Sequence, residues 1–254
     1  MPTVAGLYYF ASGEELGDRP PVLLLHGGGG SHLSWPPQIR RLSGQRMYTL
    51  DLPGHGKSEG IGRQEIDEYG KAIIEFMKAL RLPKAVMVGF SMGSAIAISL
   101  ALGYRKRVLG LGLLGAGAKM RVAPATLEMA ASPSTFQSAV EVIVENSYSA
   151  TADERLKELA TQQMLETRQA VLYGDFLACD AFDMLENVKK IHIPTLLICG
   201  GEDRMVPPNR SEYLRDEIEG AQLQIIEGAG HMVMIERPDE VASLLAGFLD
   251  QIPY

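Results

Sequence analysis

The amino-acid sequence predicts an α/β fold with a mainly parallel β-sheet and an inserted group of helices. Short apolar runs recur along the chain, as at 22–25, 108–114 and 195–199, and strands buried on both faces of a parallel sheet have this composition. Between such runs lie stretches like 64–80, where apolar residues recur at helical spacing. From 119 to about 187 the apolar runs stop, and the sequence is helical in tendency throughout.

Strands and helices alternate along the rest of the chain. A helix is expected over 64–80, a second directly after Gly93, and a third from Pro238, where Pro-Asp-Glu is a typical helix start. The expected strands, in chain order, lie at 7–10, 22–25, 47–50, 86–88, 108–114, 193–199 and 222–226.

We expect one α/β core made of residues 1–118 and 188–254, with residues 119–187 inserted as a helical cap. The chain has 254 residues, which is long enough to bury a large core without a partner. Helices in the cap are expected over 134–147, 153–167 and 168–180, with turn residues between them.

The composition is ordinary for a soluble globular enzyme, with 46% hydrophobic and 22% charged residues. A net charge of −7 argues against a nucleic-acid partner or an anionic membrane surface. The two cysteines, Cys179 and Cys199, give no disulfide framework. The sequence shows no secretory leader and no apolar stretch that could span a bilayer. We therefore expect a cytoplasmic enzyme, and the sequence leaves its oligomeric state open.

Residues 89–93 read Gly-Phe-Ser-Met-Gly, a G-x-S-x-G turn between a predicted strand and a predicted helix. A sharp turn of this kind holds a serine hydroxyl above the edge of the sheet. It also places the next backbone N–H at a helix N-terminus, where free donors and the helix dipole favour negative charge. Ser91 is therefore the candidate nucleophile.

A second glycine-rich loop follows the strand at 22–25, where residues 26–31 read His-Gly-Gly-Gly-Gly-Ser. Backbone without side chains can bring N–H groups close to a bound oxyanion. The loop lacks the G-x-G-x-x-G spacing of a dinucleotide site, and the glycines at 110–115 lie inside a predicted strand. We therefore expect no cofactor.

An acidic pair and a histidine follow the last two predicted strands. Glu202 and Asp203 come after the strand at 193–199, and His231 comes after the strand at 222–226. The carboxylate and the base of a serine triad stand at such positions. Spacing alone does not choose between the two acids, and Asp51 is an outside candidate for the same role. The other histidines are expected in structural or polar-loop positions, and their spacing matches no metal-site motif.

Residues 56–60 also fit G-x-S-x-G, but Ser58 follows a loop and precedes more glycine rather than a helix. This context does not expose a nucleophile.

Taken together, the motifs at 26–31, 51–58, 89–93, 200–207 and 228–231 resemble those of the α/β-hydrolase superfamily, in its branch with a serine nucleophile. The resemblance implies a mostly parallel eight-stranded sheet flanked by helices, although the amino terminus looks short for a full first strand. It selects Asp203 as the acid beside Ser91 and His231. It also implies an oxyanion hole formed by the backbone N–H groups of Gly28 and Met92.

This combination predicts acyl transfer, with Ser91 attacking a carbonyl, His231 moving the proton and Asp203 orienting His231. The expected substrate is a small molecule, an ester of a small to medium apolar acid, with a thioester or lactone as variants. Carbon–carbon bond cleavage of a diketone-like substrate and a hydrolase-like ligand-sensing receptor are the alternatives. Candidate residues of the substrate pocket are His26, Phe90, Phe136, Met164 and Phe176.

Overall fold

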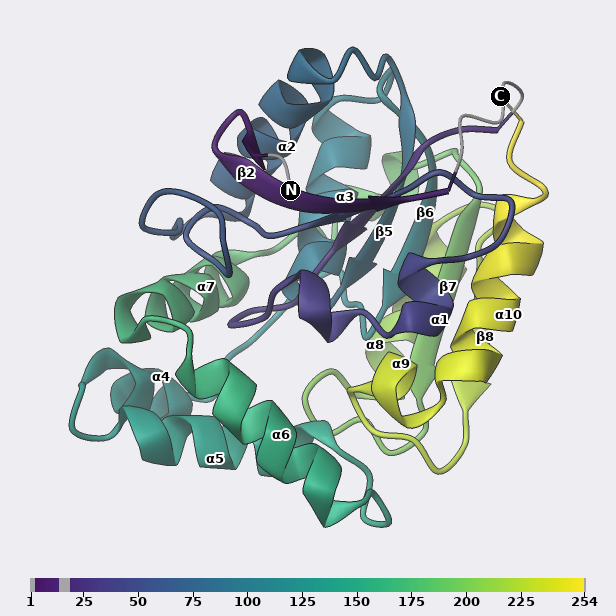
Figure 1. The fold of residues 1–254 in the computed structure, drawn as a ribbon. Helices are drawn as coiled ribbons and strands as arrows, with labels where there is room; N and C mark the ends of the chain where they lie inside the picture. Colours follow the sequence, from purple (N-terminus) through teal and green to yellow (C-terminus); the bar gives the residue numbers. More distant parts are fainter. Residues whose placement is uncertain (1–2, 14–18, 254) are drawn as a thin grey trace.

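The computed structural model describes residues 3–13 and 19–253, and within these ranges eight strands form one sheet (Figure 1). Their order across the sheet is β1-β2-β4-β3-β5-β6-β7-β8. The strands are β1 (Thr3–Val4), β2 (Leu7–Ser12), β3 (Val22–Leu25), β4 (Met47–Leu50), β5 (Ala85–Phe90), β6 (Val108–Leu114), β7 (Thr195–Gly200) and β8 (Gln222–Ile226).

The sheet has one antiparallel end and a parallel remainder. Strand β2 pairs antiparallel with both β1 and β4, and every later pairing is parallel. The mostly parallel eight-stranded sheet is therefore confirmed, and β1 is only two residues long, as the short amino terminus led us to expect.

Each face of the sheet carries its own apolar core. Along β3 and β5, Leu23 and Met87 face the core beneath helices α2 (Ile66–Ala79) and α3 (Met92–Gly103), whereas Leu24 and Val88 face the core beneath α10 (Pro238–Leu249). This alternation is the two-residue period of a strand with both faces buried. The shorter helices around the core are η1 (His32–Ser34), α1 (Pro37–Arg40), η2 (Val188–Lys190), α8 (Pro208–Glu217) and α9 (Val233–Glu236).

Four helices lie between β6 and β7 and gather at one end of the sheet (Figure 1). They are α4 (Pro124–Ala131), α5 (Phe136–Ser147), α6 (Glu154–Leu165) and α7 (Gln169–Ala181). The last three correspond to the predicted helices. The short α4 was not predicted, and it buries only Ala130, so it has no apolar stripe that could reveal it. The helices share an apolar cluster of their own, whose members include Val140 and Leu172.

None of the helices in the described ranges is both long and apolar enough to cross a membrane.

His26 links the carboxyl end of β3 to the loop after β4. Its Nδ1 donates to the carbonyl oxygen of Gly27 (2.7 Å), and its Nε2 accepts the backbone N–H of Leu52 (3.0 Å). Because Nε2 is an acceptor, the ring is neutral. Burial, together with the nearby positive charge of His55, lowers the pKa of His26 to about 4. The ring is fully buried, so His26 acts as a structural link between two loops.

This link makes the stability of the fold depend on pH. Between pH 6.5 and about 4, the unfolded chain binds a proton at His26 that the folded chain does not bind. The free energy of unfolding therefore falls as the pH falls through this window. His26→Gln should remove the contribution of His26 to this pH dependence. The slope of the free energy of unfolding against pH should then be shallower by about 1.4 kcal/mol per pH unit. Urea unfolding of both proteins between pH 7 and 4 tests this, and identical slopes would show that His26 is protonated in the fold.

Candidate active site

Ser91 occupies the turn between β5 and α3 in a conformation that is uncommon for a residue with a side chain. Its φ is 52° and its ψ is −116°, and such backbone persists only where the surroundings determine it. The N–H of Ser91 donates to the Leu114 carbonyl (2.9 Å), and its own carbonyl accepts from the N–H (2.8 Å) and hydroxyl (2.6 Å) of Ser94. The turn is thus fixed on both sides of a half-exposed serine.

Two glycines allow this turn to pack closely. A Cβ added at Gly89 would lie 2.2 Å from the Gly93 carbonyl oxygen, and one added at Gly93 would lie 2.1 Å from the Leu25 carbonyl oxygen. Both distances are too short for any side chain. The G-x-S-x-G spacing therefore reflects close contact of the turn with α3 and β3.

Of the two candidate acids, Asp203 contacts the predicted base. Its Oδ2 lies 2.7 Å from Nδ1 of His231, and its Oδ1 accepts the N–H groups of Met205 (2.9 Å) and Val206 (2.7 Å). Glu202 instead is exposed and accepts the N–H of Ala150 (3.0 Å). Because the carboxylate accepts a hydrogen bond from Nδ1–H, a neutral His231 keeps Nε2 as an acceptor.

The His231 ring lies against the elbow that carries Ser91. Its centroid is 4.8 Å from that of Phe90, the residue before Ser91. A Cβ at Gly115, at the end of β6, would lie 2.8 Å from the ring's Cε1. Both side chains of the Asp203–His231 pair are buried, so water competes little for the bond between them.

The glycine-rich loop after β3 lies beside the same serine. A Cβ at Gly27 would meet the Cβ of Ser91 at 3.3 Å. The next N–H, that of Gly28, and the N–H of Met92 at the start of α3 have no acceptor among the residues that the structure describes. Backbone donors without partners beside a serine are what an oxyanion hole requires.

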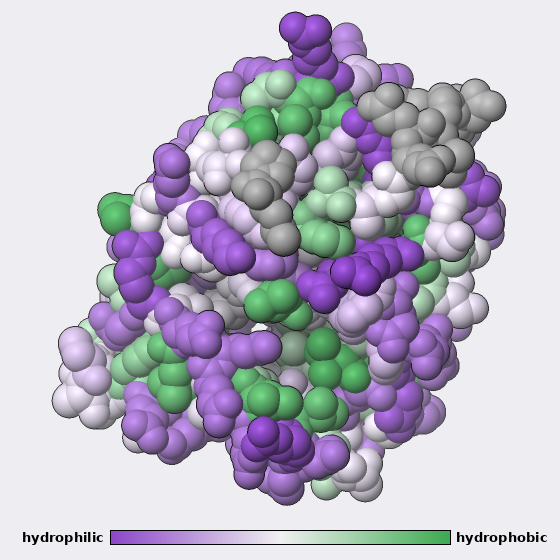
Figure 2. Space-filling model, viewed as in Figure 1, coloured by the Kyte–Doolittle hydropathy of each residue, from purple (hydrophilic) through white to green (hydrophobic). Residues whose placement is uncertain are grey.

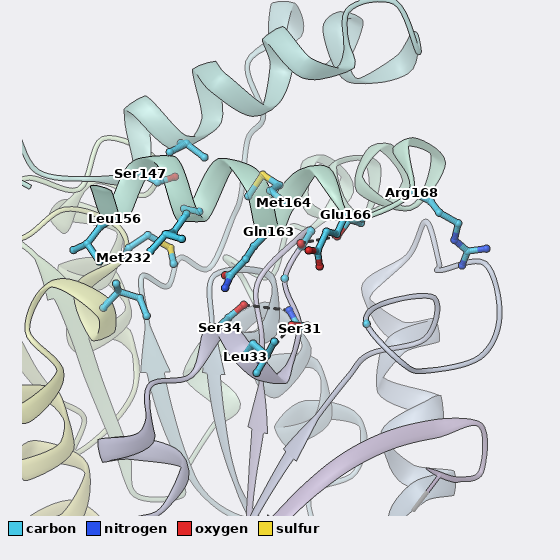
Figure 3. Close-up of a pocket in the computed structure, with 18 of the residues that line it drawn as sticks. Ser31, Leu33, Ser34, Ser147, Leu156, Gln163, Met164, Glu166, Arg168 and Met232 are labelled. Carbon is cyan, nitrogen blue, oxygen red and sulfur yellow. Dashed lines mark hydrogen bonds between the residues drawn. The ribbon is translucent and has the colours of Figure 1, made fainter. Parts of the chain in front are cut away.

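A cavity of about 640 Å³ opens between α6 and the loop at 29–34 (Figure 3). Gln163 points from α6 toward Ser34 across it (Figure 3), and Met164 of the same helix also lines it. Figure 2 shows hydrophobic residues gathered around a hollow between the inserted helices and the core. The apolar part of the lining comprises Leu33, Val144, Leu156, Leu159, Met164, Met232 and Ile235.

The cavity adjoins the predicted catalytic residues without containing them. Its lining includes Gly29 and Met232, the neighbours of Gly28 and His231, but not Ser91. Among the five predicted pocket residues, only Met164 lines it. His26 and Phe90 are buried beneath the loop and the His231 ring, and Phe136 and Phe176 belong to the apolar cluster of the inserted helices.

Sequence reasoning missed a second polar group next to the loop, formed by His55, Tyr69 and Asp175. All three are buried, and Asp175 lies within 2.8 Å of both other side chains. His55 was expected in a polar loop and belongs to the motif at 51–58, but nothing in the sequence marks Asp175 or Tyr69, which lie inside helices. Within the described ranges, no three His, Cys, Asp or Glu side chains are grouped to hold a metal ion.

The chain is similar to proteins of one enzyme family. Residues 20–238 match the family model described as "alpha/beta hydrolase fold". The chain is 26% identical to 3-oxoadipate enol-lactonase 1 of Acinetobacter baylyi, over 92% of this chain and 90% of that protein. It is 27% identical to 2-hydroxy-6-oxo-6-phenylhexa-2,4-dienoate hydrolase of Comamonas testosteroni, over 93% of this chain and 90% of that one.

Among solved structures, a thermophilic esterase superposes with a TM-score of 0.83 and 32% identity, covering 96% of this chain and 93% of the esterase. The matched residues include the turn that carries Ser91, the loop after β3 and the Asp203–His231 pair. The chain therefore belongs to the α/β-hydrolase family and is a hydrolase enzyme.

Proposed function

We propose that this enzyme hydrolyses carboxylic esters through a triad of Ser91, His231 and Asp203. The observation that carries the proposal is the buried Asp203–His231 pair, which lies against Phe90 at the elbow that presents Ser91. A nucleophile, a base and a group that orients the base are the parts that acyl transfer needs.

Each part has a defined role in the mechanism. Nε2 of His231 takes the Ser91 proton as Oγ attacks the ester carbonyl, and Asp203 stabilises the imidazolium that forms. The oxyanion accepts hydrogen bonds from the N–H groups of Gly28 and Met92. His231 then donates its proton to the departing alkoxide. Water, deprotonated by the same histidine, hydrolyses the acyl-enzyme and releases the acid.

The cavity supports an ester of a small to medium apolar acid. Its volume of about 640 Å³ lies within the usual range for small-molecule sites, and methionine and leucine form much of its wall. In this proposal residues 119–187 act as a cap, and Met164 of α6 contributes to substrate choice. Likeness to an esterase and to an enol-lactonase supports the cleavage of a C–O bond next to a carbonyl.

Carbon–carbon bond hydrolysis of a diketone-like substrate is the second candidate. It is favoured by the relative from Comamonas testosteroni, whose name describes the hydrolysis of an oxo-dienoate. The same triad would serve either reaction, so substrate assays must separate them.

A substrate panel tests the reaction type. We expect steady multiple turnover on p-nitrophenyl esters, fastest with short or medium acyl chains, and slower turnover of thioesters, lactones and vinylogous diketones. A diketone hydrolysed faster than every ester would favour the second candidate. A single turnover on all of them, with cap protection in hydrogen exchange when ligand is present, would favour the receptor alternative.

Substitutions test the triad. Ser91→Ala and His231→Gln should each lower kcat by about 10⁴-fold or more, because the triad acts as a unit, and Asp203→Asn should be severe but milder. Glu202→Gln, the matched control, should stay within about threefold, because that carboxylate accepts only a distant backbone N–H. Covalent labelling tests the choice of serine. A serine-directed phosphonate should label Ser91, and mass spectrometry locates the label. A label on Ser58, whose hydroxyl already donates to the Asp51 carbonyl, would show that the wrong serine was chosen.

Gly28 tests the oxyanion hole. An added Cβ would make ordinary contacts with Asp175 (3.4 Å) and Phe176 (3.6 Å), so Gly28→Ala should cost little. Gly28→Val adds two further methyl groups next to these neighbours, and they should displace the Gly28 N–H. The expected cost is about 3 kcal/mol in activation free energy, which is roughly 100-fold in kcat. Full activity of Gly28→Val would exclude this N–H from the reaction.

A further inference from the structure

Asp175 is a fully buried carboxylate on α7, outside the proposed triad. Its Oδ2 accepts the backbone N–H of Gly29 (2.8 Å) and lies 2.7 Å from Nε2 of His55, and its Oδ1 accepts the hydroxyl of Tyr69 (2.5 Å). A buried carboxylate is tolerated only when such partners replace water. One of these partners belongs to the loop that carries Gly28.

His55 supplies the opposite charge. Its Nδ1 lies 3.1 Å from the Pro53 carbonyl oxygen and its Nε2 lies 2.7 Å from the Asp175 carboxylate. Because both of these oxygens accept hydrogen bonds, both ring nitrogens are donors. Burial alone would lower the pKa of His55, but the charge and hydrogen bond of Asp175 outweigh burial and raise it. The two side chains thus have the geometry of a buried ion pair beside the loop.

The peptide before Gly28 is already fixed from the core side. The Gly27 carbonyl accepts Nδ1–H of His26 (2.7 Å) and the N–H of Gly30 (3.1 Å). In a trans peptide the carbonyl and the following N–H point in opposite directions. The N–H of Gly28 therefore points away from these two donors, toward no acceptor in the described part of the chain.

The next two peptides of the loop are held from the inserted segment. In the Gly28–Gly29 peptide, Asp175 accepts the N–H of Gly29 (2.8 Å). In the Gly29–Gly30 peptide, the hydroxyl of Thr167, between α6 and α7, donates to the Gly29 carbonyl (2.9 Å). Glycine backbone rotates more freely than that of any other residue. Both hydrogen bonds on the Gly27–Gly28 peptide end on one atom, the Gly27 carbonyl oxygen. Without the partners of Gly29, this peptide could still turn about that oxygen, and the Gly28 N–H could turn away from a reacting carbonyl.

We propose that Asp175 is a positioning residue for the reaction: by holding the Gly28–Gly29 peptide, it keeps the Gly28 N–H directed at the oxyanion. The inference rests on the proposed serine-hydrolase function. The hydrogen-bond partners of Asp175 among the described residues are Gly29, His55 and Tyr69, so its proposed effect reaches the reaction through the backbone of the loop.

Substitution of Asp175 should change the chemical step and leave substrate binding unchanged. With the preferred p-nitrophenyl ester, Asp175→Ala should lower kcat by about 30- to 100-fold with KM within threefold. Asp175→Asn keeps one acceptor oxygen for the Gly29 N–H, so it should lose less. Phosphonylation of Ser91 should slow in parallel with kcat, because the phosphonyl oxygen occupies the same hole, whereas the affinity for the amide analogue of the ester should not change.

Asp180→Asn is the matched control. Asp180 lies one and a half turns further along α7, and its carboxylate accepts a single backbone N–H, that of Val122 (3.1 Å). This variant should keep kcat, KM and the phosphonylation rate within twofold. Circular dichroism and thermal unfolding of each variant establish that the fold is intact. If Asp175→Ala does not fold, Thr167→Val, which removes the other anchor of Gly29, should still lower kcat and the rate of Ser91 phosphonylation by about three- to tenfold.

The outcomes separate this inference from the proposed function. If Ser91→Ala abolishes turnover while Asp175→Ala behaves like Asp180→Asn, the triad stands and the positioning role is wrong. If Asp175 substitutions raise KM and leave kcat unchanged, the residue shapes substrate binding, and the inference is again overturned. If Ser91→Ala keeps full activity, the proposed function is wrong, and the inference that rests on it is wrong as well.

Discussion

The strained backbone of Ser91 is the constraint around which this edge of the molecule is arranged. A positive φ at a residue with a side chain costs about 1–3 kcal/mol. It persists here because hydrogen bonds and close packing with the neighbouring strands fix the turn in this conformation. Leu114 of β6 accepts the N–H of Ser91, and Ser94 of α3 donates to the Ser91 carbonyl. Strand β3 lies so close to Gly93 that no side chain fits there. The histidine ring and the glycine-rich loop are then placed against a rigid support.

Three buried aspartate–histidine pairs lie along this edge. Asp203 with His231, Asp175 with His55, and Asp51 with His32 all have oxygen–nitrogen distances of 2.7–2.8 Å. The residues around each pair indicate a different role for it. Asp51 also accepts the backbone N–H groups of His32 and Lys57, and these hydrogen bonds outweigh burial and keep its pKa below the ordinary value. That pair organises the loop after β4, whereas only His231 stands against the elbow.

The sequence predicted those features that depend on local pattern. Strands β6 and β8 begin and end where their apolar or alternating runs do. Glu202, Asp203 and His231 became candidates because they follow strands of a parallel sheet, and the family resemblance chose Asp203 between the two acids. Asp175 could not be found in this way. It lies inside a mainly apolar helix, and its partners Gly29, Tyr69 and His55 are 146, 106 and 120 residues away in the chain. Similarly, Met164 lines the cavity while Phe136 and Phe176 join the helix cluster, because packing among α4–α7, rather than residue type, decides which side chains face inward.

The anchoring of Gly29 by Thr167 and Asp175 has a consequence for how such enzymes diversify. Both anchors belong to the segment between β6 and β7. This segment therefore also supports the loop after β3, and it cannot be exchanged without affecting that loop. A chimera that receives the inserted helices of another hydrolase would inherit new walls for its cavity and lose the support of its own glycine-rich loop. Grafting α4 to α6 while retaining residues 167–181 would keep the two tasks separate.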